Sequence, residues 1–264
     1  MIKNLLAFIV CFSIPLVNLT FAGEPDIKLH EKCLYPTVRV ADTSGQGYGS
    51  GVIVRSEKVD DGYLNVVLTC KHVVENMDFM DIVIMTYKNW SEMAGMRQYP
   101  ARLYASHPDF DISIVLFLSS KKMPTADLGL DEQLYVGNDL VSFGCALKQM
   151  PRLDTGTISG VAKNSIRSDL VSVPGDSGGP VFHNYKLIAL KMMFFGAQLN
   201  EQVHPVFNIA VQVRLSVLKQ WAEQDDKAKL PIDADAQMPK LDVLLINAQL
   251  FKPPQFLFHF PHLL

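Results

Sequence analysis

The feature that most constrains the fold of this chain is a series of short apolar runs between Pro36 and Val211. The runs are rich in Val, Ile, Leu, Tyr and Phe, have the length of ordinary β-strands, and are separated by turn residues rather than by long helical segments. This pattern predicts an all-β fold with antiparallel connections. The runs cover residues 37–40, 47–55, 62–70, 80–87, 99–106, 110–119, 138–147, 155–163, 168–173, 179–183, 186–195 and 206–213.

A polar break between the sixth and seventh runs divides the pattern into two groups of similar size. The break, residues 120–137, contains lysines, a proline and glycines, which are typical of loops. We therefore predict two six-stranded antiparallel β-barrels, the first over residues 37–119 and the second within residues 138–224, where a C-terminal α-helix follows the strands.

That helix is predicted because the apolar period changes near residue 213. Val213, Val217, Leu218 and Trp221 recur at the spacing of an amphipathic helix. The tail that follows, residues 225–264, is apolar near its end but is interrupted by prolines, which argue against a membrane span. The pattern assigns this tail no structure and no role.

The first 22 residues have the order of a secretory signal peptide. Lys3 precedes a long apolar run, and Thr20 and Ala22 stand where a signal peptidase requires small residues before a cut at Gly23. We therefore expect a secreted or periplasmic protein with no stable membrane span after signal removal. A retained membrane anchor is the alternative, and the polar break after the apolar run argues against it. Residues 23–36 would then be an N-terminal segment or a short propeptide.

Composition excludes two further classes. Hydrophobic residues make up 48% and charged residues 19% of the 264 residues, which excludes a disordered polymer. The formal net charge is −3, so the chain has no basic excess for binding nucleic acid. Export would leave Cys33, Cys70 and Cys145, whose spacing does not resemble a metal site and which we interpret as small buried side chains.

The segment that most directly indicates a catalytic site is residues 174–180, Pro-Gly-Asp-Ser-Gly-Gly-Pro. Glycines around Ser177 let the backbone turn sharply and leave the hydroxyl accessible. They also let the amides of Gly175 and Ser177 point into one concavity, as a developing oxyanion requires. A glycine-rich hairpin turn is the plainer interpretation, but the full string favours a nucleophile.

A serine nucleophile needs a base, and the base needs a carboxylate to fix its tautomer. His72 stands at the end of a strand-like run, which would deliver its ring to an edge of the sheet. Asp111 opens an alternating apolar run, where a carboxylate is unusual unless it has a partner. Asp109 is the competitor, but it lies in a sequence typical of an exposed turn, so we prefer Asp111.

Together these segments resemble the trypsin-like (chymotrypsin-fold) serine endopeptidases, and among them the bacterial Deg proteases and glutamyl endopeptidases. The resemblance implies a chymotrypsin-like double barrel with the triad His72, Asp111 and Ser177 between the barrels, protein or peptide substrates, no cofactor and no metal. The strings that carry it are GSGVIV (49–54), TCKHVV (69–74), DISIVLF (111–117), LYVGNDLVSFG (134–144), TGTISGVAK (155–163) and PGDSGGPVF (174–182).

The chain also departs from these families. Deg proteases usually have Asn where this chain has Asp176, and in the digestive-type members a newly cut N-terminus pairs with that Asp. Because no such start precedes Gly49, the resemblance implies that another group holds Asp176 or that the oxyanion loop orders only with substrate. It leaves open a disulfide between Cys33 and Cys145. The tail is too short for the C-terminal peptide-binding domain of Deg proteases.

The same resemblance assigns Val171, Ser172 and Lys191 to the walls of the specificity pocket. Val171 stands where tryptic enzymes have an acidic residue, so we do not expect a preference for Lys or Arg. Lys191 matches the pocket histidine of glutamyl endopeptidases, where a buried lysine would pair with an acidic substrate side chain. We therefore expect a preference for acidic or for medium apolar side chains before the scissile bond. Strand alternation offers the alternative that Lys191 points outward.

The predicted function is that of a secreted serine endopeptidase acting through an acyl-enzyme. One alternative is a catalytically silent, protease-like binding module. The other is an envelope protein quality-control factor whose proteolysis is secondary. The sequence does not indicate an oligomeric state.

Overall fold

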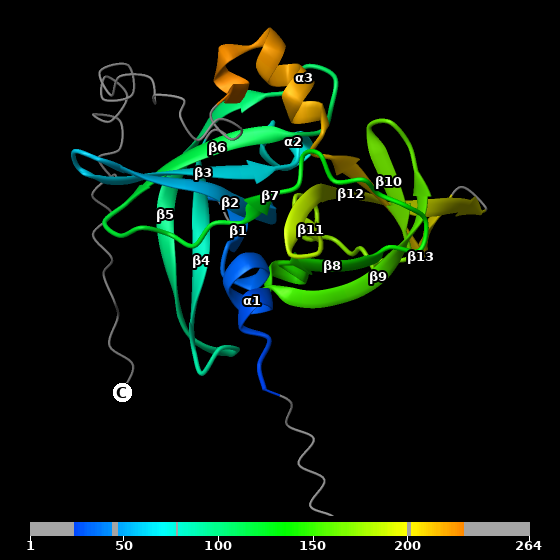
Figure 1. Ribbon diagram of the computed structural model, residues 1–264, viewed down its shortest axis with the longest axis horizontal. Coiled ribbons are helices and arrows are strands. Elements are labelled where there is room, and N and C mark those ends of the chain that lie inside the picture. Colours follow the sequence, from blue (N-terminus) through cyan, green and yellow to red (C-terminus); the bar gives the residue numbers. More distant parts are fainter. Residues whose placement is uncertain (1–23, 44–46, 78, 200–201, 230–264) are drawn as a thin grey trace, which may run out of the picture.

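The computed structural model describes residues 24–43, 47–77, 79–199 and 202–229. Two antiparallel β-barrels lie side by side, and helix α3 (Val217–Gln224) packs against the outside of the first (Figure 1). The predicted chymotrypsin-like double barrel with a C-terminal helix is therefore confirmed. The predicted signal peptide, residues 1–22, and the tail from residue 230 onward lie outside the described residues. Within the described part, no helix is long and apolar enough to cross a membrane.

The first barrel is closed, with the strand order β1-β2-β3-β6-β5-β4. Alternation builds its core: Val38 and Val40 of β1 are fully buried, whereas Arg39 between them is only partly buried. Closure leaves no unpaired strand edge. The strands are β1 (Thr37–Asp42), β2 (Tyr48–Val59), β3 (Gly62–Thr69), β4 (Met80–Lys88), β5 (Glu92–Ser106) and β6 (Ser113–Ser119).

The second barrel is formed by β11-β8-β9-β10-β13-β12, which the pairing of β11 with β12 closes. A short strand that we did not predict, β7 (Asp127–Leu128), lies in the connection between the barrels and pairs parallel with β12. The other strands are β8 (Asp139–Gly144), β9 (Arg152–Val161), β10 (Ser165–Ser168), β11 (Pro180–His183), β12 (Lys186–Leu199) and β13 (Gln202–Arg214).

Several boundaries differ from the sequence prediction; for example, β5 begins at Glu92 rather than at residue 99, and β13 begins at Gln202 rather than at residue 206. The expected strand at 168–173 ends at Ser168, because the carboxylate of the next residue, Asp169, accepts the Thr157 amide and hydroxyl in place of a ladder bond. Helix α3 begins at Val217 rather than at residue 213, because Val213 still pairs with Leu190 of β12.

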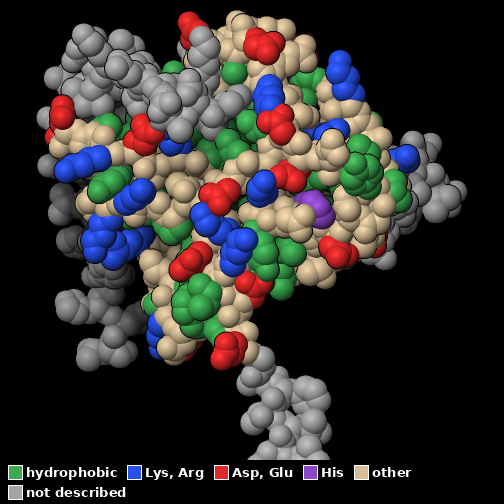
Figure 2. All heavy atoms as spheres, in the orientation of Figure 1, with side chains coloured by type: hydrophobic (Ala, Val, Ile, Leu, Met, Phe, Trp, Pro, Cys, Tyr) green, Lys and Arg blue, Asp and Glu red, His purple; other side chains and the backbone are tan. Residues whose placement is uncertain are grey.

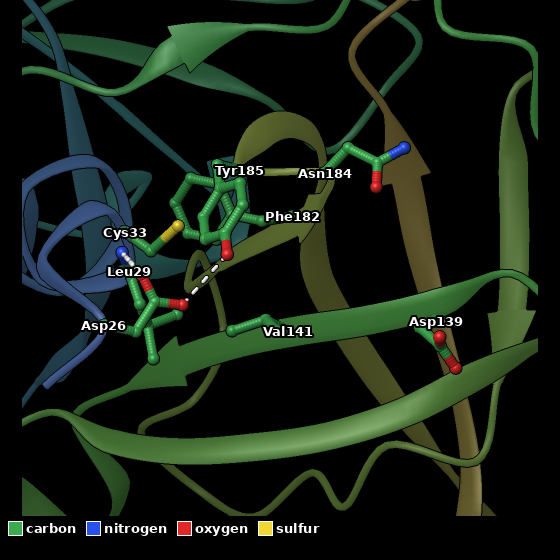
Figure 3. A pocket seen from close by; sticks show the side chains of 8 residues that line it. All are labelled: Asp26, Leu29, Cys33, Asp139, Val141, Phe182, Asn184 and Tyr185. Carbon is green, nitrogen blue, oxygen red and sulfur yellow. Dashed lines mark hydrogen bonds between the residues drawn. The ribbon is translucent and has the colours of Figure 1, made fainter. Parts of the chain in front are cut away.

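Residues 24–36 pack against both barrels. Helix α1 (Ile27–Leu29) is capped by the Asp26 carboxylate and continues into a wider turn, His30–Leu34, that buries Cys33 completely. Between this segment and the second barrel lies a cavity of about 230 Å³, across which the Tyr185 hydroxyl donates to Asp26 (Figure 3). This packing does not test the propeptide role, which stays a prediction.

Cys33, Cys70 and Cys145 are buried free thiols, so the Cys33–Cys145 bridge that the resemblance left open is not formed. Cys33 belongs to the large core, whereas Cys145 packs with Val83 and Met85 in a separate small cluster. On the face that Figure 2 shows, acidic and basic side chains are interspersed.

Candidate active site

His72 lies on a single helical turn between the barrels. Strand β3 ends at Thr69, and helix α2 (Lys71–Val74) follows at once, anchored by the buried side chains of Val73 and Val74. The His72 side chain retains 44% of its exposure. The sequence therefore delivers the imidazole to the molecular surface at the edge of the first barrel, as the end of a strand-like run predicted.

Asp111 lies in the turn before β6 and faces His72. Its Oδ2 is 2.6 Å from His72 Nδ1, and its Oδ1 accepts the His72 amide at 2.9 Å. The competitor Asp109 is exposed and donates its amide to the ring of the buried His107 (3.0 Å). Phe110 donates to the same ring nitrogen (3.1 Å), so His107 holds the turn that presents Asp111.

The electrostatics of the His72–Asp111 pair favour an imidazole that accepts a proton. The hydrogen bond that the His72 ring donates to Asp111 raises the pKa of His72 and outweighs burial, which lowers this pKa. Burial pushes the pKa of Asp111 upward, but the hydrogen bonds from the His72 ring and amide together hold this pKa below its usual value. Asp111 therefore stays ionised while His72 gains or loses a proton.

Ser177 lies in a loop of the second barrel that is bonded directly to the first. Its carbonyl accepts the Ser50 amide at 2.7 Å. Its hydroxyl lies 3.5 Å from the Met192 carbonyl and, within the described residues, makes no hydrogen bond to His72. Such bonds are often long in free enzymes and tighten when substrate binds. Gly178 has a φ of +81°, and a Cβ there would lie 2.2 Å from the Ser50 carbonyl oxygen, so only glycine allows this approach.

The amides of Gly175 and Ser177 have no hydrogen-bond partner among the described residues. Gly175 has a φ of +98°, and its carbonyl accepts the Ser50 hydroxyl at 2.7 Å. The same hydroxyl oxygen accepts the Cys145 amide at 2.7 Å. Ser50 therefore ties the oxyanion loop to β2 and to the end of β8. Sequence reasoning missed this role, although Ser50 lies within the string GSGVIV.

Asp176, between the two free amides, is 1% exposed and surrounded by donors. Its Oδ2 lies 3.3 Å from Arg152 Nη2, 3.8 Å from Lys191 Nζ and 3.1 Å from the Val173 amide. Two internal cations, Arg152 and Lys191, therefore face the Asp176 carboxylate in the position where digestive-type relatives place a newly cut N-terminus.

The predicted pocket residues lie beside this cluster. Lys191 is 1% exposed, so the alternative of an outward-pointing side chain is wrong. Its Nζ donates to the Val171 carbonyl (2.9 Å) and to Asp154 Oδ2 (3.2 Å), so carboxylates of the chain itself already neutralise its charge. Val171 and Ser172 are partly buried in the loop that precedes Ser177.

Cys70, His72 and Asp111 present ligand atoms within 4.8 Å of one another, which is the donor set of a metal site. Each donor is already engaged, however. His72 and Asp111 bind each other, and the Cys70 thiol donates to the Lys191 carbonyl at 3.1 Å. Burial raises the pKa of Cys70 well above its usual value, which opposes the thiolate that a metal would need. The arrangement suits proton transfer better than metal binding.

The chain is similar to a known protein family and to several known proteins. Residues 49–190 match the model of the trypsin-like peptidase domain. A probable periplasmic serine endoprotease DegP-like of Pseudomonas putida (strain W619) is 28% identical over 159 residues, which cover 57% of this chain and 30% of that protein. Putative protease Do-like 14 of Arabidopsis thaliana is 26% identical over 156 residues, 52% of this chain and 33% of that protein.

A solved structure, the serine endoprotease from Yersinia pestis, has a TM-score of 0.57 and 19% identity, and the match covers 76% of this chain and 67% of that one. At this identity the likeness concerns the fold alone. The chain spans about a third of the length of the curated relatives it matches.

Proposed function

This chain belongs to the trypsin-like peptidase family, and on that basis we propose that it is a serine endopeptidase hydrolysing peptide bonds in proteins or peptides through His72, Asp111 and Ser177. The observation that carries the proposal is the two-point contact of Asp111 with His72, at 2.6 Å and 2.9 Å. A carboxylate held only by chance near a histidine would not fix both the ring and the backbone of its partner.

In the proposed mechanism Ser177 attacks the scissile carbonyl, and His72 Nε2 takes the hydroxyl proton. The carbonyl oxygen becomes an oxyanion and accepts hydrogen bonds from the amides of Gly175 and Ser177. His72 then gives its proton to the leaving amine, and an acyl-enzyme remains on Ser177. His72 then takes a proton from a water that attacks the ester, the bond between the acyl carbon and the Ser177 oxygen breaks, and His72 returns the proton to that oxygen. Asp111 stays ionised throughout and stabilises the imidazolium.

We place this activity outside the cytoplasm, in the periplasm or the secreted fraction. Two observations support that location. The first 22 residues have the pattern of a signal peptide, and the similar protein of Pseudomonas putida is named as periplasmic.

For specificity we propose medium apolar side chains before the scissile bond. The acidic alternative needs a free cation in the pocket, and the ammonium of Lys191 is already engaged by Asp154 and the Val171 carbonyl. A panel of fluorogenic peptides tests this: Leu and Val substrates should turn over well and Glu and Asp substrates poorly. Faster cleavage after Glu would reverse the assignment.

Labelling with a fluorophosphonate, followed by peptide mass mapping, tests the activity itself. We expect a stoichiometric adduct on Ser177 of the wild-type protein, none on the Ser177→Ala variant, and slow labelling of His72→Ala. Ser216→Ala is a suitable control, because Ser216 only precedes α3. A folded wild-type protein that forms no adduct would support the catalytically silent binding module instead.

A further inference from the structure

We propose that Lys191 is a positioning residue that holds both flanks of Ser177, so that the oxyanion loop is ordered without a freed N-terminal ammonium group. The inference rests on the proposed serine endopeptidase function and deepens it. It concerns a residue of β12 that the mechanism above does not use.

The side chain of Lys191 holds the residue before the nucleophile. Its Nζ lies 3.8 Å from Asp176 Oδ2 and 3.2 Å from Asp154 Oδ2, and it donates to the Val171 carbonyl at 2.9 Å. Lys191 and Asp176 are each 1% exposed. A charge so deeply buried persists only with a partner of opposite sign, so Asp176 depends on a buried cation.

The backbone of Lys191 holds the residues after the nucleophile. Its carbonyl accepts the Gly178 amide at 2.8 Å, and its own amide donates to the Gly179 carbonyl at 2.9 Å. The same carbonyl accepts the Cys70 thiol at 3.1 Å, two residues before His72. One residue of β12 therefore contacts the loop on both sides of Ser177 and the turn that carries the base.

Of the two cations that face Asp176, Lys191 is the buried one. Arg152 also approaches Oδ2, at 3.3 Å, but its side chain is 45% exposed, so solvent screens its charge. Oδ1 is buried without a partner among the described residues, and Gly144 packs against it so closely that a Cβ there would lie 2.3 Å away. This side offers no room for a chain terminus to enter.

The consequence concerns the two amides that flank Asp176. Because Asp176 lies between Gly175 and Ser177 in the chain, we infer that burial of its side chain fixes the backbone that presents their two N–H groups. Lys191 supplies from within the barrel the positive charge that this burial needs. Cleavage of the chain ahead of the first strand is then not required to form the oxyanion hole.

The test replaces Lys191 with methionine, which keeps most of the side-chain length and removes the charge. Fluorophosphonate labelling of Lys191→Met and its kcat should both fall by about 100-fold, the loss typical of an impaired oxyanion hole. KM should change little. Lys186→Met is the matched control: Lys186 lies on the same strand and pairs with Glu132 at 2.6 Å, but it is 52% exposed, and it should label at the wild-type rate.

A rescue variant separates positioning from simple loss of packing. Lys191→Met combined with Asp176→Asn removes the carboxylate that the single substitution leaves without its buried cation. We expect this double variant to regain labelling at least about 10-fold over Lys191→Met. A double variant no faster than the single one would mean that the charge pair does not position the loop.

Two further measurements distinguish a failure of the Lys191 inference from a failure of the proposed endopeptidase function. The chain beginning at Gly23 and the same chain with an added N-terminal tag should label equally; labelling that appears only after the tag is removed would overturn the inference. Hydrogen exchange should become faster at 174–180 in Lys191→Met and not in Lys186→Met. If wild type fails to label, the proposed function fails, and the exchange data still decide whether Lys191 orders the loop.

Discussion

Asp111 holds His72 at two points, with one carboxylate oxygen 2.6 Å from the ring nitrogen Nδ1 and the other accepting the backbone amide at 2.9 Å. The ring contact fixes the tautomer, because Nδ1 must carry its proton to donate it. In the proposed mechanism, Nε2 is thereby left as the nitrogen that accepts the proton of Ser177.

Replacing Asp111 by asparagine should lower kcat by about 10⁴-fold, because an amide at this position favours the wrong tautomer of His72. The matched control is Asp109→Asn, two residues earlier, where the side chain is exposed and, among the described residues, only the backbone amide is hydrogen-bonded. Steady-state kinetics on a peptide substrate measure both variants. Equal losses in the two would contradict the assignment of Asp111.

The pH dependence of kcat/KM should show activity rising with pH through a His72 pKa above the ordinary value of about 6.5. Only the neutral ring can accept the serine proton, so activity is lost as pH falls. In Asp111→Asn the acid limb should move to lower pH, because the hydrogen bond that raises the pKa is lost. An acid limb at the same pH in both proteins would show that another group controls it.

The His72–Asp111 pair also makes the free energy of unfolding depend on pH. The contribution of His72 is lost as pH rises, and that of Asp111 is lost as pH falls. The contribution of His72, whose folded pKa is raised, is complete below about pH 6.5 and is lost as pH rises through the folded pKa. The contribution of Asp111, whose folded pKa is lowered, is complete above about pH 3.9 and is lost as pH falls through the folded value. Chemical denaturation across this range should show Asp111→Asn losing most stability between these two limits.

Substituting alanine for Gly175 should disturb the oxyanion loop, because a Cβ there would lie 2.7 Å from both the Cys145 carbonyl oxygen and the Tyr48 ring. We expect kcat to fall by about 10²- to 10³-fold. Gly137→Ala has a similar backbone, with a φ of +91° against +98°, but its Cβ would meet nothing within 4 Å. It should lose some stability and no activity. A full loss of activity in both would indicate general misfolding instead.

Cys33, Cys70 and Cys145 should resist alkylation in the native protein at pH 8. Burial is the largest cause that raises the pKa of Cys33 and of Cys145 to about 12 and that of Cys70 well above its usual value, so few thiolates are present. In guanidinium chloride without reductant, iodoacetamide should modify all three. If iodoacetamide modified only one thiol and the unlabelled protein were lighter by two hydrogens than expected, a disulfide would be present, contrary to this structure.

Trp221 of α3 should matter for both stability and activity. Its ring is 1% exposed and lies 5.0 Å from the ring of His107, the residue that holds the turn before Asp111. We expect Trp221→Ala to cost about 3–5 kcal/mol of unfolding free energy and to lower kcat. Lys219→Ala, on an exposed position of the same helix, is the control and should leave kcat unchanged. A Trp221 variant that is destabilised but fully active would show that α3 does not support the active site.

Much of this architecture was predictable from local patterns. Eleven of the twelve predicted runs overlap a strand along most of their length, because alternation of buried and exposed side chains is a property of each strand alone. The exception was residues 168–173, where the Thr157 amide donates to the Asp169 carboxylate in place of a backbone carbonyl. That bond depends on how β9 and β10 meet, and no local pattern encodes it.

The sequence by itself determined the double barrel and the candidates His72, Asp111 and Ser177, since strand periodicity and the glycine-rich string are local. The tertiary structure decided what surrounds them. Lys191 and Asp154 are separated by 37 positions, and Ser50 and Gly175 by 125. Each pair meets only after the barrels close in one register. Closure brings Lys191 next to the residues on both sides of Ser177 and places its ammonium group near the carboxylates of Asp154 and Asp176.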